Sequence, residues 1–189
     1  MPTVLPATQL MGYAVRQVYP ADGEAMQSQS VSFDVSFLLG GQVVGGPPRL
    51  FRIYAASNFI EAGPDMPFLQ IGEHEYGKRI LDRALGYDTP LDEGIELALV
   101  SMDSTLRSNL TVGMPADLLV VRRGALAVER RYRVTEEDAC FPMIRERWSV
   151  GLREAYQGIP RPDWPQNPAW EMGAAQSISG QAPGRNRRP

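Results

Sequence analysis

The order of the predicted helices and strands favours an α+β fold, a four-layer αββα sandwich, for this chain of 189 residues. Two groups of predicted strands flank a pair of predicted helices, and a further helix is predicted at each end of that series. Two sheets packed face to face, with helices outside them, would bury the apolar faces of both the strands and the helices. The length is sufficient for one domain with a sizeable core.

The first predicted helix covers residues 6–19. Leu10 and Tyr13 lie at helical spacing within it, and Pro20 is expected to end it because proline interrupts a helix interior. Residues 21–30 are polar and contain an Asp-Gly turn signal, so they are predicted to form a loop.

Strict alternation of apolar and polar residues predicts a half-buried strand over residues 31–39. A turn rich in glycine and proline at 45–48 joins it to a second predicted strand over 50–56, which indicates an antiparallel hairpin. Because this turn joins two strands and not a strand and a helix, it is not a phosphate-binding loop. Short further strands are predicted at 58–61 and 68–71.

Two helices are predicted next, over residues 76–85 and 90–107. Thr89 is the expected N-cap of the second helix, and Pro90 is expected in its first turn. The apolar side chains of this second helix form one continuous stripe, which predicts a buried face.

A second pair of strands is predicted after these helices. The continuous apolar run at 117–121 predicts a strand that is covered on both faces, and residues 125–134 are expected to pair with it. Thr135 is predicted to cap a closing helix, in which Ile144 and Trp148 lie on the apolar face.

Composition divides the chain into a predicted domain, residues 1–158, and a tail, residues 159–189. The tail has six prolines, three arginines close to its end and little periodic apolar content. Such a composition is typical of an extended or disordered segment.

Composition also excludes several classes of function. A formal net charge of -3 argues against nucleic acid as the main partner. No apolar run is long enough to span a bilayer, and the start of the chain lacks the basic region of a secretory signal. Cys140 is the single cysteine, which fits a reducing compartment. We therefore expect a cytoplasmic protein with neither nucleic-acid nor membrane partners.

Two groups of residues offer chemistry, each with a structural alternative. His74, the single histidine, lies between two glutamates, but this set lacks the spacing of known metal sites, so a solvated loop is favoured and no metal is expected. Ser101, Asp103 and Ser104 suggest a nucleophile, but no base is placed beside them, which favours polar residues that pack helices together. Cys140 is interpreted as a small core residue.

Several long segments carry a family resemblance. Residues 38–58, with a strand that ends in glycine, a Gly-Pro-Pro turn and a Leu-Phe-Arg-Ile strand, resemble proteasome β-type subunits. Further segments resemble the bacterial proteasome-like family called Anbu, the ancestral β subunit: NFIEA at 58–62, PFLQIGE at 67–73, YGK at 76–78, ILDR at 80–83 and SMDSTLRSNL at 101–110. The resemblance extends over about residues 4–156.

The resemblance implies an N-terminal-nucleophile hydrolase fold. In that family a threonine at the mature N-terminus attacks the scissile carbonyl, and its own α-amine takes the hydroxyl proton. The family's opening strands, with this threonine and its supporting aspartate and lysine, have no counterpart here: Thr3 is not terminal, and Lys78 lies in a different segment. An N-terminally truncated chain, with its sandwich incomplete at the N-terminus and with no catalytic residue, is therefore expected.

One family motif has a looser counterpart. Proteasome subunits have an R-D-x-x-S-G pattern after the second core helix, and its aspartate and serine support the terminal threonine. Arg107 begins the matching segment here, with Ser108 in place of the aspartate and Thr111 in place of the serine. The resemblance makes Ser108 and Thr111 candidates for lining an active site; the alternative is an ordinary helix C-terminal cap.

The function that the resemblance implies is that of a proteasome-type peptidase subunit. It would assemble with copies of itself into a ring or helical assembly, act on peptides or unfolded proteins, and need no cofactor. The chain as it stands is expected to be inactive alone. The alternative is a non-catalytic, homo-oligomeric assembly or scaffold subunit.

Overall fold

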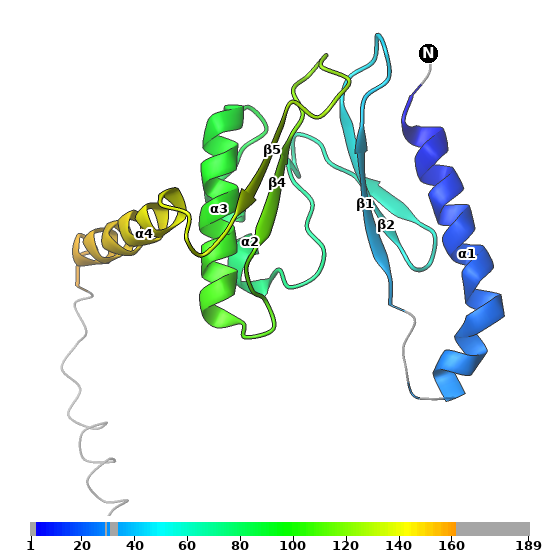
Figure 1. Ribbon diagram of the computed structural model, residues 1–189, viewed down its shortest axis with the longest axis horizontal. Coiled ribbons are helices and arrows are strands. Elements are labelled where there is room, and N and C mark those ends of the chain that lie inside the picture. The colour runs from blue at the N-terminus through cyan, green and yellow to red at the C-terminus, as the bar shows by residue number, and fades with distance from the viewer. Residues whose placement is uncertain (1–2, 29, 31–33, 162–189) are drawn as a thin grey trace, which may run out of the picture. The chain divides into compact units, whose positions relative to one another are not determined.

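The structure is a computed structural model that describes residues 3–28, 30 and 34–161. The chain divides into two compact units, Met1–Gly151 and Leu152–Pro189. Its elements follow one another in the order α1 (Leu5–Ser28), β1 (Ser36–Gly41), β2 (Arg49–Tyr54), β3 (Phe59–Glu61), α2 (Glu75–Ala84), α3 (Leu91–Ser108), β4 (Ala116–Val120), β5 (Arg130–Val134) and α4 (Cys140–Gln157) (Figure 1). The predicted alternation of helices with two separate groups of strands is confirmed.

Helix α1 continues through Pro20, so the predicted helix end and the predicted loop over 21–30 were wrong. A proline inside a helix removes one backbone hydrogen bond. Thr8, Val15 and Gly23 are buried at spacings of about two helical turns, so one buried face extends on both sides of the proline. The packing of this face outweighs the local cost of the proline.

Strands β1, β2 and β3 form an antiparallel sheet in that order, which confirms the predicted hairpin. Leu39 of β1 pairs with Phe51 of β2, and Phe51 pairs with Glu61 of β3. Phe51 and Ile53 are fully buried, and the Phe51 ring meets that of Phe59 edge-on. Residues 31–33 of the predicted first strand lie outside the described residues.

Helix α1 packs against this sheet through a close backbone approach (Figure 1). A Cβ atom on Gly12 would lie 2.9 Å from the carbonyl oxygen of Ser57, in the turn after β2. Only glycine allows this separation, because any side chain at position 12 would push the helix away from the turn.

The segment at residues 64–73, which we call the strap, connects the first sheet to α2. A strand was predicted at 68–71, but the strap has no regular secondary structure there, so this prediction was wrong. Residues 68–71 pair with no described strand; instead the ring of Phe68 lies 5.6 Å from the ammonium group of Lys78 on α2.

Helices α2 and α3 lie side by side, and their backbones approach each other closely at Gly77. A Cβ atom on Gly77 of α2 would lie 2.7 Å from the carbonyl oxygen of Ser101 and 3.0 Å from Oγ1 of Thr105, both on α3.

The expected N-cap of α3 was wrong by one residue: Pro90 takes that position, and the Thr89 hydroxyl oxygen accepts a hydrogen bond from the amide of Gly86.

Strands β4 and β5 form the second antiparallel sheet, with Ala116 opposite Val134. Val134 and Val120 are buried, whereas Leu119 is 59% exposed, so the prediction that both faces are covered was wrong for the described residues. Gln42 links the two hairpins of the first unit: its Oε1 accepts a hydrogen bond of 2.7 Å from the amide of Gly124.

Asp138, and not the predicted Thr135, caps the start of α4. Its Oδ1 accepts hydrogen bonds from the amides of Cys140 at 2.9 Å and Phe141 at 3.3 Å, while its Oδ2 accepts one from the hydroxyl of Tyr132. The hydroxyl of Tyr132 and then the amide of Cys140 lower the pKa of Asp138.

Cys140 is exposed, so its interpretation as a core residue was wrong. Among the described residues, no helix is long and apolar enough to cross a membrane. The predicted tail lies outside the described residues from position 162 onward.

Candidate functional site

The loop after α3 is organised by one asparagine. Asn109 follows the last residue of α3, and its amide donates to the carbonyl of Thr105 at 2.9 Å. Its side-chain Oδ1 accepts hydrogen bonds from both the amide and the hydroxyl of Thr111, at 2.8 and 2.7 Å. This turn fixes the direction in which the Thr111 hydroxyl donates its proton.

Ser108 is the last residue of α3 and Thr111 lies on the loop that follows it; both are exposed. In the part of the chain that the structure describes, neither hydroxyl is hydrogen-bonded to a carboxylate, an amine or an imidazole. An active-site-lining role for the two residues stays a prediction. Sequence analysis missed Asn109, although an asparagine two residues before a threonine is a known signal for such a turn.

The serines of α3 have the packing role that sequence analysis favoured. Ser101 and Thr105 are buried against Gly77, and the hydroxyl of Thr105 donates to the carbonyl of Ser101 at 3.1 Å. The hydroxyl of Ser104 donates to the carbonyl of Val100, also at 3.1 Å. The hydroxyls of Ser104 and Thr105 therefore bond to the backbone of their own helix and not to a base among the described residues.

Asp103 is the buried charge of α3, with 1% of its surface exposed. Its Oδ1 lies 2.5 Å from Nε of Arg145 on α4, and its Oδ2 lies 3.7 Å from Nε of Arg107. A buried carboxylate needs such partners, because an unpaired charge in the interior is strongly unfavourable. The Asp103–Arg145 pair thus joins the first turns of α4 to α3, near the end of α3 at Ser108.

His74 occupies the N-cap position of α2, before the helix begins. Its Nδ1 lies 2.8 Å from the carbonyl oxygen of Gly72, a contact that holds the ring against its own loop. No group of three or more potential metal ligands occurs among the described residues. The geometry agrees with the loop interpretation and offers nothing for the metal-site alternative.

A cavity of about 460 Å³ lies next to the loop that follows α3. The strap, α2 and α3 line it, and so does Val112, the neighbour of Thr111. Glu73 is the one carboxylate in this lining, and the other side chains are mainly apolar. A ligand bound here would meet an apolar surface with a single acidic group.

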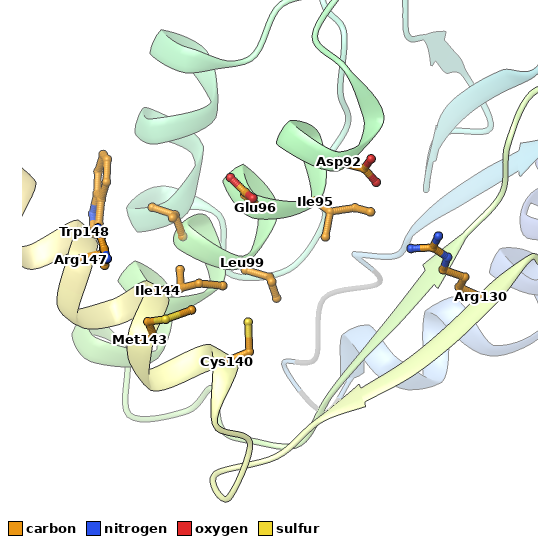
Figure 2. Close-up of a pocket in the computed structure, with 11 residues that line it drawn as sticks. Asp92, Ile95, Glu96, Leu99, Arg130, Cys140, Met143, Ile144, Arg147 and Trp148 are labelled. Atoms are coloured by element: carbon orange, nitrogen blue, oxygen red, sulfur yellow. The ribbon is translucent and has the colours of Figure 1, made fainter.

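A larger groove, about 620 Å³ in volume, lies between α3 and the first turns of α4 (Figure 2). Its apolar lining consists of Ile95, Leu99, Val100, Met143, Ile144 and the ring of Trp148. The thiol of Cys140 points from the start of α4 toward Leu99 (Figure 2). A groove of this kind can receive an apolar side chain from a partner.

Charges of opposite sign border this groove. Asp92 and Glu96 supply acidic groups from α3, whereas Arg147 on α4 and Arg130 on β5 supply basic groups. Figure 2 shows the acidic groups on the α3 side and the basic groups on the other elements. The groove is therefore apolar at its floor and divided in charge at its rim.

Comparison with solved structures gives consistent relatives. The chain is 44% identical to Anbu (ancestral beta-subunit) from Yersinia bercovieri, with a TM-score of 0.78 over 87% of this chain and 68% of that one. It is 50% identical to the protein in the helical assembly of the Anbu complex from Pseudomonas aeruginosa, with a TM-score of 0.79 over 88% and 68% of the two chains. It is 44% identical to the Gly-1 mutant of Anbu from Hyphomicrobium sp. strain MC1, with a TM-score of 0.78 over 87% of this chain and 68% of that one.

No protein-family profile matches the sequence, and no curated protein matches it either. The structural relatives have the proteasome-like N-terminal-nucleophile fold, which confirms the four-layer αββα class expected from the order of elements. Identity of 44–50% over two thirds or more of these relatives extends the agreement from fold to sequence. The chain belongs to the Anbu family of proteasome-like proteins.

Proposed function

We propose that this chain is a proteasome-type subunit that assembles with copies of itself in the cytoplasm and handles peptides or unfolded proteins. The observation that carries the proposal is the relationship to the Pseudomonas aeruginosa protein, which forms a helical assembly. At 50% identity, a similar mode of self-association is the expectation for this chain.

The groove between α3 and α4 supports self-association. Its floor is apolar, and its rim has acidic groups on one side and basic groups on the other. Two copies related by a two-fold axis would place the acidic side of each opposite the basic side of the other. Met143 is 53% exposed at this groove, so burying it would stabilise the contact.

A glutamate at the groove tests this assignment. We expect Met143→Glu to shift the chain to smaller species in mass photometry, because burying a charge at an apolar contact is unfavourable. Val44→Glu is the matched control, since Val44 is 78% exposed in the turn between β1 and β2, away from the groove. Assembly of Met143→Glu at the wild-type size would contradict the assignment.

We also infer that these 189 residues do not hydrolyse peptides by themselves. Family resemblance assigns the nucleophile to a terminal threonine that uses its own amine as base. Thr3 has two residues before it. In the described segments, the hydroxyls of Ser104, Thr105 and Ser149 donate to backbone carbonyls and that of Thr111 donates to an amide oxygen, none of which could act as a base. Acting alone, the chain then has the second candidate role, that of a non-catalytic assembly subunit.

Two purified proteins separate these roles. One is the 189-residue chain, and the other is the same chain preceded by the opening segment of the Pseudomonas aeruginosa protein, where the family resemblance places the threonine. With fluorogenic peptides, we expect turnover from the extended protein alone. In that protein, Ser108→Ala and Thr111→Val should lower kcat without altering assembly if the two residues line the active site. Hydrolysis by the 189-residue chain would contradict the inference.

A further inference from the structure

We propose that a second cavity, bounded by β2, the strap and α2, binds a carboxylate that has an N–H donor beside it. This group occurs at the C-terminus of a peptide and in N-acylated amino acids. The cavity has a volume of about 500 Å³, within the range of small-molecule sites. It is separate from the α3–α4 groove, and the proposal does not depend on self-assembly.

Arg52 of β2 supplies the positive group. It lines the cavity, and its Nε is buried without a hydrogen-bond partner among the described residues. Its guanidinium carbon lies 4.7 Å from the centre of the Tyr54 ring, which restricts the plane of the group. A buried donor without an acceptor is rare in folded proteins and calls for an explanation.

Gln70 of the strap supplies the complementary group. Its Oε1 is also buried without a partner among the described residues, and the residue lines both this cavity and the 460 Å³ cavity described above. One cavity thus holds an unsatisfied donor and an unsatisfied acceptor. A carboxylate would accept from Arg52, and the neighbouring N–H of the same ligand would donate to Gln70.

The lining contains Arg52 and Lys78 as cations and Asp65 and Asp82 as carboxylates, and the ion pairs among them decide which groups stay available to a ligand. Lys78 and Asp82 neutralise each other, with Nζ at 2.5 and 2.7 Å from the two carboxylate oxygens. Asp65 is exposed and forms no ion pair with a described residue. Arg52 is therefore the cation of the lining that lacks an ion-pair partner, and guanidinium groups recognise carboxylates through paired, charge-assisted hydrogen bonds.

The rest of the lining suits an apolar side chain on the ligand. It consists mainly of Ile60, Met66, Phe68, Leu69 and Leu85 together with two prolines. Leucine is accordingly a suitable residue for a first probe, because its side chain can occupy apolar space while the carboxylate meets Arg52.

Saturation-transfer NMR titrations of the 189-residue chain test the proposal with three matched compounds. N-acetyl-leucine has the carboxylate and the N–H, 4-methylpentanoate has only the carboxylate, and N-acetyl-leucinamide lacks the negative charge. We expect N-acetyl-leucine to bind most tightly and the uncharged amide to bind at least about tenfold more weakly. Equal binding of acid and amide, or no binding of the acid at millimolar concentration, would overturn the proposal.

Variants assign the binding to the two residues. We expect Arg52→Gln to weaken N-acetyl-leucine binding at least about tenfold. Arg49→Gln is the matched control on the same strand, because Arg49 pairs with Glu61 and does not line the cavity. Circular dichroism verifies the fold of each variant. A loss with Arg49→Gln equal to that with Arg52→Gln would overturn the assignment.

Gln70→Leu provides a readout that a folding defect would not imitate. It should weaken N-acetyl-leucine binding and leave 4-methylpentanoate binding unchanged, because only the N–H contact is removed. Equal loss for both compounds would overturn the role of Gln70. N-acetyl-Ala-Ala-Leu then distinguishes the sources of the ligand: tighter binding than N-acetyl-leucine indicates a peptide C-terminus, and equal binding indicates a single N-acylated residue.

Discussion

Two arginine–carboxylate pairs with the same closest distance hold two different regions of this molecule. Arg145 and Asp103 join α4 to α3, and Arg49 and Glu61 join β2 to β3; in each pair an arginine nitrogen lies 2.5 Å from a carboxylate oxygen. The Asp103 side chain is 2% exposed, whereas the Glu61 side chain is 37% exposed. Burial of the carboxylate, and not contact distance, separates the two pairs, because the arginine side chains are 38% exposed for Arg145 and 23% exposed for Arg49.

The difference also concerns what each pair connects. Backbone hydrogen bonds already pair β2 with β3, so the Arg49 pair adds little to their position. Arg145 and Asp103 are 42 residues apart and belong to helices without a shared ladder of hydrogen bonds. The Asp103 pair can therefore decide where the first turns of α4 lie, whereas the Arg49 pair adds to a contact that the strands already make.

The largest effect is expected from removing the cation of the buried pair. Arg145→Met should lower the free energy of unfolding by about 3 kcal/mol, because Asp103 would stay buried with only the distant Arg107 beside it. Arg49→Met should leave the urea midpoint essentially unchanged. Equilibrium urea denaturation of both variants measures the contrast.

A double substitution sharpens this comparison. Asp103→Leu combined with Arg145→Met removes both charges, and most of the lost stability should return, because apolar pairs often replace buried ion pairs without loss. If Arg49→Met costs as much as Arg145→Met, burial is not the factor that separates the two regions.

A smaller effect is expected at the crossing of α2 and α3, where no charge is involved. Gly77→Ala should destabilise the protein by about 1–2 kcal/mol, because the new methyl group would meet the Ser101 carbonyl at 2.7 Å. Thermal unfolding measures this cost. A loss of stability in Gly77→Ala would show that close packing, besides the Asp103 ion pair, positions α3.

Gly151→Ala is the matched control, since Gly151 is also helical and a Cβ there would meet nothing within 4 Å. It should be neutral or slightly stabilising, because alanine is a better helix former than glycine. An equal loss in Gly77→Ala and Gly151→Ala would contradict the packing argument.

The smallest effect is expected at the half-buried carboxylate of Asp138, where pH is the probe. The Tyr132 hydroxyl lowers the pKa of Asp138, so this contact stabilises the fold above the ordinary aspartate pKa. That contribution is lost as the pH falls through the lowered value. The same hydrogen bond raises the pKa of Tyr132, so its contribution declines again in strong alkali.

Tyr132→Phe should therefore raise the pKa of Asp138 toward its ordinary value, which carbon-detected NMR titration of the carboxyl group measures. Tyr87→Phe is the control, since Tyr87 is exposed and makes no contact with Asp138. An unchanged Asp138 titration in Tyr132→Phe would show that the hydroxyl does not act on it.

The elements that sequence analysis predicted well are those with a strong periodic signal. Alternation around Phe51 and Ile53 identified the first hairpin, and an apolar stripe identified α3. Ends were less predictable: Pro20 did not stop α1, and Asp138 replaced Thr135 as a cap. Ends depend on packing and on which of several polar side chains reaches the free amides.

The candidate site, like the fold, was predicted only in part from sequence. Resemblance to the family drew attention to Ser108 and Thr111, and the structure places them at the end of α3 and on the loop that follows it. It was the structure that revealed Asn109 as the group that orients Thr111, and Arg145 as the partner of Asp103. The second pair is invisible in sequence because its members are far apart along the chain.

The family of this protein, the kinds of its elements and their order were all accessible from sequence, because they depend on local periodicity and on extended similarity. The groove between α3 and α4, the buried Asp103 pair and the unsatisfied groups of Arg52 and Gln70 were decided by tertiary structure. Burial and the meeting of distant residues determine these features, and neither is encoded within any single segment.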